Sequence, residues 1–216
     1  MPKELIIFPC NGNGIEALDS IDPATFSFVG FIDDNFASKQ DAGGKWKVED
    51  RSMLDRYPGA LLLAVPGGPA SFQKRKEHID GLGVPNERFT TVIHPYAHIG
   101  RNVHIGTNTL IMAGVVITSN AWIGDNVCIL PNTVVHHDTR IGDYTLVGSS
   151  VVIAGGSIVG CNCYIGSGSN LINGINIGDF SLVGIGSNVI QNFPSRSRIA
   201  GNPARDIPLK NISFNG

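Results

Sequence analysis

An aliphatic residue stands at every sixth position over nearly half of the chain. Seventeen such positions run from Ile93 to Val189, and all of them hold Ile, Val or Leu. Glycine often follows directly, and the residue four places further on is commonly small or β-branched, as at Thr109 and Ser157. A period of six fits neither an α-helix nor an alternating strand. It predicts a short strand and a turn repeated as the sides of a prism, with the aliphatic residue inside and the small residue at the crowded corner.

Three such sides form one coil of eighteen residues. The run from Ile93 to Pro194 therefore holds between five and six coils, and ladder hydrogen bonds stack neighbouring strands about 4.8 Å apart. Coils of this kind bury a continuous core only by stacking on one another. Residues eighteen positions apart are thus expected to be direct neighbours on adjacent coils.

The first 90 residues follow a different pattern. Buried strands are predicted at Leu5–Phe8, Phe26–Ile32 and Ala60–Val65, and helices at Ile15–Ser20 and Ser71–Gly81. Strands that alternate with helices indicate a small parallel α/β sheet, whose strands carry ligand-binding loops at their carboxyl ends. We predict an α/β domain over residues 1–90, a β-helix over 91–194 and a C-terminal tail over 195–216.

Two features of the α/β domain are candidates for ligand binding. A glycine-bearing loop, Pro9–Gly14, follows the first strand and could hold a pyrophosphate on its backbone N–H groups. Taken alone, such a loop is more often a plain strand-to-helix turn. Asp33 and Asp34 end the second strand. They either cap a turn or bind a base or ribose.

Composition excludes several classes of protein. The net charge is −2 and only 16% of residues are charged, so there is no basic surface for nucleic acid or anionic lipid. The longest apolar stretch, Ala60–Val65, is too short to cross a bilayer. The N-terminus has no signal-peptide pattern, and we expect a cytoplasmic protein. The four cysteines are expected to be free thiols, with Cys163 packed inside the coil beside Cys161 and binding no metal.

The repeat resembles the hexapeptide-repeat acyltransferases, whose fold is a left-handed parallel β-helix. Members of that family are usually trimers that bind acetyl-CoA in the groove between adjacent helices. The whole chain is similar to one subgroup, the sialic acid O-acetyltransferases and bacillosamine N-acetyltransferases. The segments that carry this similarity are Val29–Asp34, Ile93–Pro95, Val135–Asp138, Ile141–Asp143 and Gly201–Arg205.

The resemblance implies that the α/β domain binds a nucleotide-linked amino sugar. The residues implied to bind it are Gly12, Asn13, Asp33, Asp34 and Gly67. The first loop departs from the family pattern Gly-Ala-Gly-Gly-His, because Asn13 replaces the histidine that lies near the sugar phosphates. Leu146 replaces a second histidine, near the cofactor. These departures leave the identity of the sugar open.

His137 is the candidate general base. Steps of eighteen place Ser119, His137, Gly155 and Asn173 in one column, so the neighbours of His137 on adjacent coils are small. A sugar amine must lose a proton to attack a thioester, and an imidazole with a pKa of about 6.5 accepts one near neutral pH. Asp138 follows at once and can orient the ring.

In the resembling enzymes the aligned histidine is the base, an acidic residue matching Asp138 assists it, and the glycine matching Gly155 donates its N–H to the thioester oxygen. The resemblance also implies acetyl-CoA contacts at Ser167, Ile185 and Arg205. His136, His94 and His98 are interpreted as solvent, interface or structural residues.

Three alternatives remain at this stage. The acceptor is either an amine or the hydroxyl of a sialic-acid-like sugar. A carbonic anhydrase on the same coil would need three histidines that converge on zinc, and the histidine spacing does not suit this, so no metal is expected. A non-catalytic scaffold is disfavoured because His137 and Asp138 are retained opposite Gly155.

Overall fold

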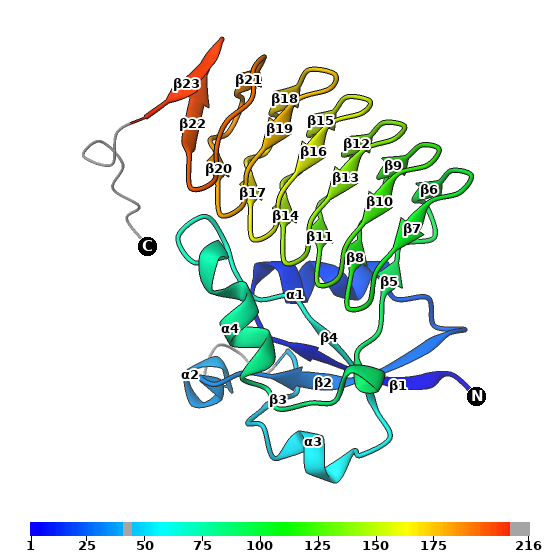
Figure 1. The fold of residues 1–216 in the computed structure, drawn as a ribbon. Coiled ribbons are helices and arrows are strands. Elements are labelled where there is room, and N and C mark those ends of the chain that lie inside the picture. Colours follow the sequence, from blue (N-terminus) through cyan, green and yellow to red (C-terminus); the bar gives the residue numbers. More distant parts are fainter. Residues whose placement is uncertain (41–44, 208–216) are drawn as a thin grey trace.

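The computed structural model describes residues 1–40 and 45–207, which form an α/β domain followed by a stack of coils (Figure 1). A parallel sheet in the order β3-β2-β1-β4 is the centre of the first part. Its strands are β1 (Lys3–Phe8), β2 (Phe26–Ile32), β3 (Val48–Glu49) and β4 (Leu61–Ala64). The helices are α1 (Gly12–Ala17), α2 (Phe36–Gln40), α3 (Met53–Arg56) and α4 (Arg75–Asp80), with 3-10 turns η1 (Leu18–Ser20), η2 (Phe72–Lys74) and η3 (Asn86–Arg88).

The predicted start of the first helix is wrong. Helix α1 begins at Gly12, three residues before the predicted Ile15. The side chain of Asn11 accepts a hydrogen bond from the N–H of Gly14 at 2.8 Å, which caps the first turn. Much of the predicted glycine loop is therefore the first turn of α1. The sequence pattern also did not reveal β3, which is only two residues long.

The coils form a left-handed parallel β-helix with three faces. Every strand from β5 to β21 has two residues. The first face holds β5 (Val92–Ile93), β8 (Leu110–Ile111), β11 (Cys128–Ile129), β14 (Leu146–Val147), β17 (Tyr164–Ile165) and β20 (Leu182–Val183). The second holds β6 (His98–Ile99), β9 (Val116–Ile117), β12 (Val134–Val135), β15 (Val152–Ile153), β18 (Asn170–Leu171) and β21 (Asn188–Val189). The third holds β7 (His104–Ile105), β10 (Trp122–Ile123), β13 (Arg140–Ile141), β16 (Ile158–Val159) and β19 (Asn176–Ile177).

The predicted coil length of eighteen residues is confirmed by the register of the strands. Trp122 pairs with Arg140, for example, and Val134 with Val152. Near the end the coil shortens, because β20 pairs with β22 (Arg198–Gly201), which then forms a hairpin with β23 (Ala204–Asp206). Residues 208–216 of the predicted C-terminal tail lie outside the described residues.

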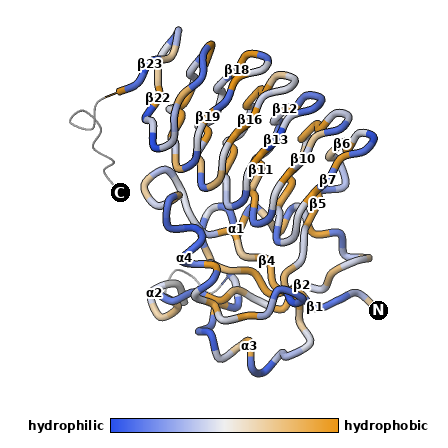
Figure 2. The backbone as a smooth tube through the Cα atoms, viewed as in Figure 1, coloured by the Kyte–Doolittle hydropathy of each residue, from blue (hydrophilic) through white to orange (hydrophobic). Residues whose placement is uncertain are grey.

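The inside of the prism is filled as the six-residue period predicts. Aliphatic residues from Ile111 to Val189 are buried in one continuous core, and Figure 2 shows hydrophobic segments recurring along the coils. The first coil is the exception: Ile93 is 39% exposed and Ile99 and Ile105 are only half-buried, because no coil lies beneath this one. The small corner residues, such as Thr133 and Ser157, are fully buried.

The α/β domain packs against the first face of the β-helix. Leu110, Cys128 and Leu146 share a core with residues of β1, including Leu5 and Ile7. Leu146, the residue that replaces the second histidine of the family pattern, is thus buried beneath the α/β domain.

Buried polar contacts fix this packing. Arg75 of α4 is wholly buried and donates hydrogen bonds to the carbonyl oxygens of Pro66, Asn126 and Tyr144. The side chain of Asn108 bonds both the N–H and the carbonyl oxygen of Ala64, at 2.7 and 3.1 Å. Because these groups are buried, losing one partner would leave an unsatisfied polar atom. None of the helices within residues 1–40 and 45–207 has the length and apolar character needed to cross a lipid bilayer.

Candidate active site

His137 lies in the turn between β12 and β13, at the corner where the second and third faces meet. The column predicted for this corner is confirmed by main-chain hydrogen bonds between successive coils. The N–H of Asp138 donates to the oxygen of Ser119 at 3.1 Å, and the N–H of Gly156 donates to the oxygen of His137 at 2.9 Å. We call the column of Ser119, His137, Gly155 and Asn173 the His137 corner.

The imidazole of His137 is held by its neighbour. Its Nδ1 lies 2.7 Å from Oδ2 of Asp138, and both side chains are more than half exposed. This hydrogen bond, together with one from Asn120, holds the pKa of Asp138 below its usual range. An ionised carboxylate at Nδ1 favours the tautomer with the hydrogen on Nδ1. That tautomer leaves Nε2 with a free lone pair, as a general base requires.

Gly155 allows the imidazole to lie across the next coil. A Cβ atom added to Gly155 would lie 2.6 Å from Nε2 of His137, which is closer than real Cβ contacts. The space above His137 is therefore filled by its own ring, whereas the sequence suggested an opening there. The N–H of Gly155 donates to no group within residues 1–40 and 45–207. A free lone pair and a free N–H thus lie side by side.

The predicted acetyl-CoA residues are not all at this corner. Ser167 and Ile185 lie one corner away, where the first and second faces meet, and they stack because the N–H of Gly186 donates to the oxygen of Ser167. Ser167 Oγ accepts from the N–H of Ser149 at 3.1 Å, while Ile185 is 78% exposed. Arg205 is exposed on β23. Of this predicted set, Gly155 lies against His137 within one chain.

Three of the five predicted sugar-binding residues, Asp33, Asp34 and Gly67, lie just after the carboxyl ends of β2 and β4. A pocket of about 270 Å³ lies there. Its lining residues are Phe8, Pro9, Asp33, Asp34, Asn35, Pro66, Gly67, Ser71 and His78. The side chain of Asn13 donates to the oxygen of Gly67 at 3.2 Å. Gly12 is in the first turn of α1 and does not line the pocket.

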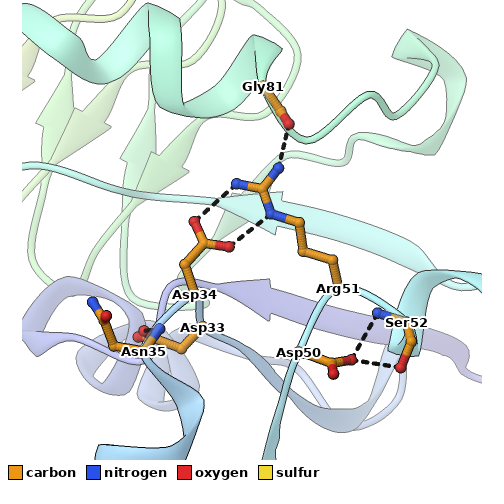
Figure 3. Close-up of polar contacts among 7 residues, drawn as sticks. All are labelled: Asp33, Asp34, Asn35, Asp50, Arg51, Ser52 and Gly81. Carbon is orange, nitrogen blue, oxygen red and sulfur yellow. Dashed lines mark hydrogen bonds and ion pairs between the residues drawn. The ribbon is translucent and has the colours of Figure 1, made fainter.

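The two aspartates have different surroundings (Figure 3). Asp33 is buried and accepts hydrogen bonds from the N–H groups of Cys10 and Asn35, at 3.1 and 2.8 Å. It therefore caps the turn, which was one of its two predicted roles. Asp34 is exposed and forms a two-point ion pair with Arg51, at 2.7 and 2.8 Å.

Arg51 also donates to the oxygen of Gly81, which ties the Asp34 loop to the end of α4. The hydrogen bond from Arg51 lowers the pKa of Asp34. Sequence reasoning missed Arg51, Ser71 and His78 because no motif links them to the strand ends. Only the tertiary fold brings these three residues to the pocket or its loops.

The remaining histidines and cysteines have local roles. His94 Nδ1 accepts from the N–H of Tyr96 at 2.9 Å, and His136 is half-buried. Cys163 is buried in the coil, as predicted, and burial raises the pKa of its thiol to about 12. Over the part of the chain that the structure describes, no three His, Cys, Asp or Glu side chains are grouped as a metal site would need.

The first part of the β-helix matches a known protein-family model. The family model for bacterial transferase hexapeptides of six repeats matches residues 90–119 and 120–155. The matched residues form the first coils of the β-helix and include His137, Asp138 and Gly155. The chain is therefore similar to the bacterial hexapeptide transferases over residues 90–155. A search of curated proteins gave no significant match.

Solved structures resemble the chain over almost its full length. PerB from Caulobacter crescentus, in complex with CoA and GDP-perosamine, is 28% identical with a TM-score of 0.80, over 96% of this chain and 98% of that one. A perosamine N-acetyltransferase from the same organism, with one histidine replaced by asparagine, is 26% identical with a TM-score of 0.81 and the same coverage. The acetyltransferase domain of PglB from Neisseria gonorrhoeae, in complex with acetyl coenzyme A, shares the fold at 20% identity, with a TM-score of 0.82 over 96% and 100% of the two chains.

Proposed function

We propose that this protein transfers the acetyl group of acetyl-CoA to the amine of a nucleotide-linked amino sugar. The observation that carries the proposal is the imidazole of His137, oriented by Asp138 at 2.7 Å and lying across Gly155, whose N–H is free within the described residues. The PerB structure, at 28% identity, holds CoA together with GDP-perosamine, and this supports both substrates.

The reaction follows from these groups. Nε2 of His137 takes a proton from the neutral sugar amine as its nitrogen attacks the thioester carbonyl carbon. The N–H of Gly155 donates to the carbonyl oxygen, which gains negative charge in the tetrahedral intermediate. The C–S bond then breaks, and the proton on the imidazole returns to the CoA thiolate. Asp138 stabilises the imidazolium between these two steps.

The pocket at the ends of β1, β2 and β4 is the proposed site for the nucleotide. Asp34 is ionised and exposed there, so its free lone pairs can accept hydrogen bonds from a ribose hydroxyl or a base N–H. The two-point pair with Arg51 keeps that carboxylate in one orientation. Gly67, which follows β4, lines the same pocket, and the side chain of Asn13 in α1 donates to its carbonyl oxygen.

We also propose that acetyl-CoA binds between two copies in a homotrimer. Ser167 and Ile185 lie one corner away from His137, so a thioester that touches all three needs the corners of two different chains. Large apolar side chains are exposed on the coils as a subunit contact would require. They are Ile158, Ile172, Ile185 and Ile190.

The test is acetyl transfer with a panel of nucleotide-linked amino sugars, measured as release of free thiol from acetyl-CoA. His137→Ala should lower kcat at least about a hundredfold, because a positioned base contributes about 10²–10⁴-fold. His136→Ala is the matched control, one residue away in the same turn, and should stay within about threefold of wild type. Full activity of His137→Ala would exclude it as the base, while thiol release only with hydroxyl acceptors would indicate O-acetylation. A folded protein that releases no thiol with any acceptor would indicate a scaffold.

A further inference from the structure

A ladder of side chains extends from His137 away from Gly155. Asp138 uses Oδ2 for the imidazole and Oδ1 for the side-chain N–H of Asn120, at 3.1 Å. Asn120 in turn accepts from the side chain of Asn102 at 3.3 Å. Asn102, Asn120 and Asp138 are eighteen residues apart, so each belongs to a successive coil.

The backbone places these three side chains in line. All three residues have left-handed φ angles, 55° at Asn102, 61° at Asn120 and 59° at Asp138. Asn and Asp tolerate this conformation better than other residues with a side chain. The next two residues of the column, Gly156 and Gly174, are left-handed glycines. The ladder therefore begins at Asn102 and ends at Asp138, beside the imidazole.

These hydrogen bonds define which end of the Asn120 side-chain amide faces Asp138. The Oδ1 of Asn120 is used by Asn102, so its Nδ2 is the group that faces Asp138. A carboxylate that accepts from two sides cannot rotate without losing one of these hydrogen bonds. By position along the stacked coils, the charged or titratable residues near this ladder are His136 and Arg140 on the coil of Asp138 and Arg101 on the coil of Asn102. The residues directly above and below His137, Gly155 and Ser119, are uncharged.

We propose that Asn120 is a positioning residue that orients the carboxylate of Asp138 against Nδ1 of His137. The inference rests on the proposed function for its effect on turnover. Asn120 acts through Asp138 and touches no reacting atom. Its contribution is to keep Oδ2 in line with the ring so that Nε2 points across Gly155.

Two substitutions test this. Asn120→Gly keeps the left-handed backbone without strain and removes the donor, so kcat should fall about three- to tenfold with little change in KM for acetyl-CoA. Asn120→Asp keeps the shape but replaces the donor with a second negative charge. That charge favours the protonated imidazole, so the acidic limb of the kcat/KM profile should move to higher pH by about half a unit.

The matched controls are Asn102→Gly and Asn102→Asp, in the same column and backbone conformation but not in contact with Asp138. Their rates should stay within about twofold of wild type, and their pH profiles should shift less than that of Asn120→Asp. A second readout is independent of turnover: the NMR titration of the His137 imidazole, assigned by its loss in His137→Ala. Its midpoint should move upward in Asn120→Asp.

The outcomes separate the two proposals. Loss of turnover in His137→Ala together with wild-type profiles and titrations in both Asn120 variants would overturn the positioning role alone. Normal turnover in His137→Ala, with the imidazole titration still shifted by Asn120→Asp, would overturn the proposed function and keep the orienting contact. If Asn102→Asp and Asn120→Asp shift the pH profile and the imidazole titration equally, the effect comes from the added charge and not from the contact with Asp138. That result would overturn the proposal.

Discussion

Two corners of the same β-helix differ in whether the N–H groups of their turns have a hydrogen-bond acceptor on the next coil. The corner between the third and first faces is called the Asp143 corner. There, a carboxylate on the next coil accepts a hydrogen bond from the turn N–H of each of two successive coils. We call an N–H with such an acceptor closed and one without it open. Asp125 Oδ1 accepts from the N–H of Thr107 at 2.7 Å, and Asp143 Oδ1 accepts from the N–H of Asp125 at 2.9 Å. At the His137 corner, the N–H of Gly155 has no acceptor within the described residues, and Asn173 stands in the equivalent position.

Under the proposed function, this difference separates turns that stabilise the stack from the turn that carries the chemistry. The backbone of both corners is the same turn, repeated every eighteen residues. A closed amide stabilises the stack but cannot bind a substrate oxygen. An open amide costs some stability and provides a fixed donor, which is the kind of group that stabilises an oxyanion without reorganisation.

The largest effect is expected from Gly155→Ala. The added methyl group would take the place of the His137 ring, 2.6 Å from Nε2. Gly155 does not have a left-handed φ, so alanine does not strain the backbone. We expect kcat to fall about a hundredfold or more, since the base is displaced and the donor is shielded. The control is Gly59→Ala, where a Cβ meets nothing within 4 Å. Wild-type kcat in Gly155→Ala would show that the ring need not lie there.

The open corner can also be closed by design. In Asn173→Asp, a carboxylate one coil above Gly155 could accept its N–H as Asp143 does for Asp125. We expect kcat to fall about tenfold and Tm to rise by about 2 °C, because one amide gains a cap of about 0.5–1 kcal/mol. Asn173→Ala removes the side chain without supplying an acceptor and should change neither value much. An active, stabilised Asn173→Asp enzyme would mean that the Gly155 N–H takes no part in the reaction.

Opening the closed corner should have the reverse effect. Asp143→Ala leaves the N–H of Asp125 without its acceptor. The loss of about 1 kcal/mol should lower Tm by about 2–4 °C, with kcat unchanged. Thermal unfolding and the thiol-release assay on the same preparation measure both quantities. A fall in kcat with no change in Tm would contradict the assignment of this corner to stability.

The coil and its histidine corner could be predicted because the six-residue repeat gives equivalent positions the same environment along the chain. Once one strand and turn is known, every sixth residue has the same environment, and adding eighteen to His137 gives Gly155. The burial of Thr133 and of Cys163 follows from the same arithmetic. The error at Ile93 arises where the repeat has no neighbour below it.

The α/β domain could be predicted only in outline. Its strands follow from hydrophobic runs, but the contacts that position the pocket join residues with no periodic relation. Asp34 pairs with Arg51, and Arg75 bonds the carbonyl of Tyr144, 69 residues away. The start of α1 was missed although Asn11 is a good N-cap residue, because its glycines suggested a loop. The direction of Asn120 toward Asp138 also required coordinates.

The smallest effect concerns the stability of the open corner itself. Hydrogen bonds from His137 and then Asn120 hold the pKa of Asp138 below the ordinary 3.8 of an aspartate. A carboxylate with a lowered folded-state pKa contributes stability that is fully present above its unfolded pKa and is lost as the pH falls through its folded pKa. Asp138 is exposed, so Asp138→Asn should lower Tm by less than about 1 °C at pH 6. The difference should disappear as the pH falls below 3.8. A Tm loss at pH 6 as large as that of Asp143→Ala would show that the His137 corner also carries stability, and the contrast between the two corners would not hold.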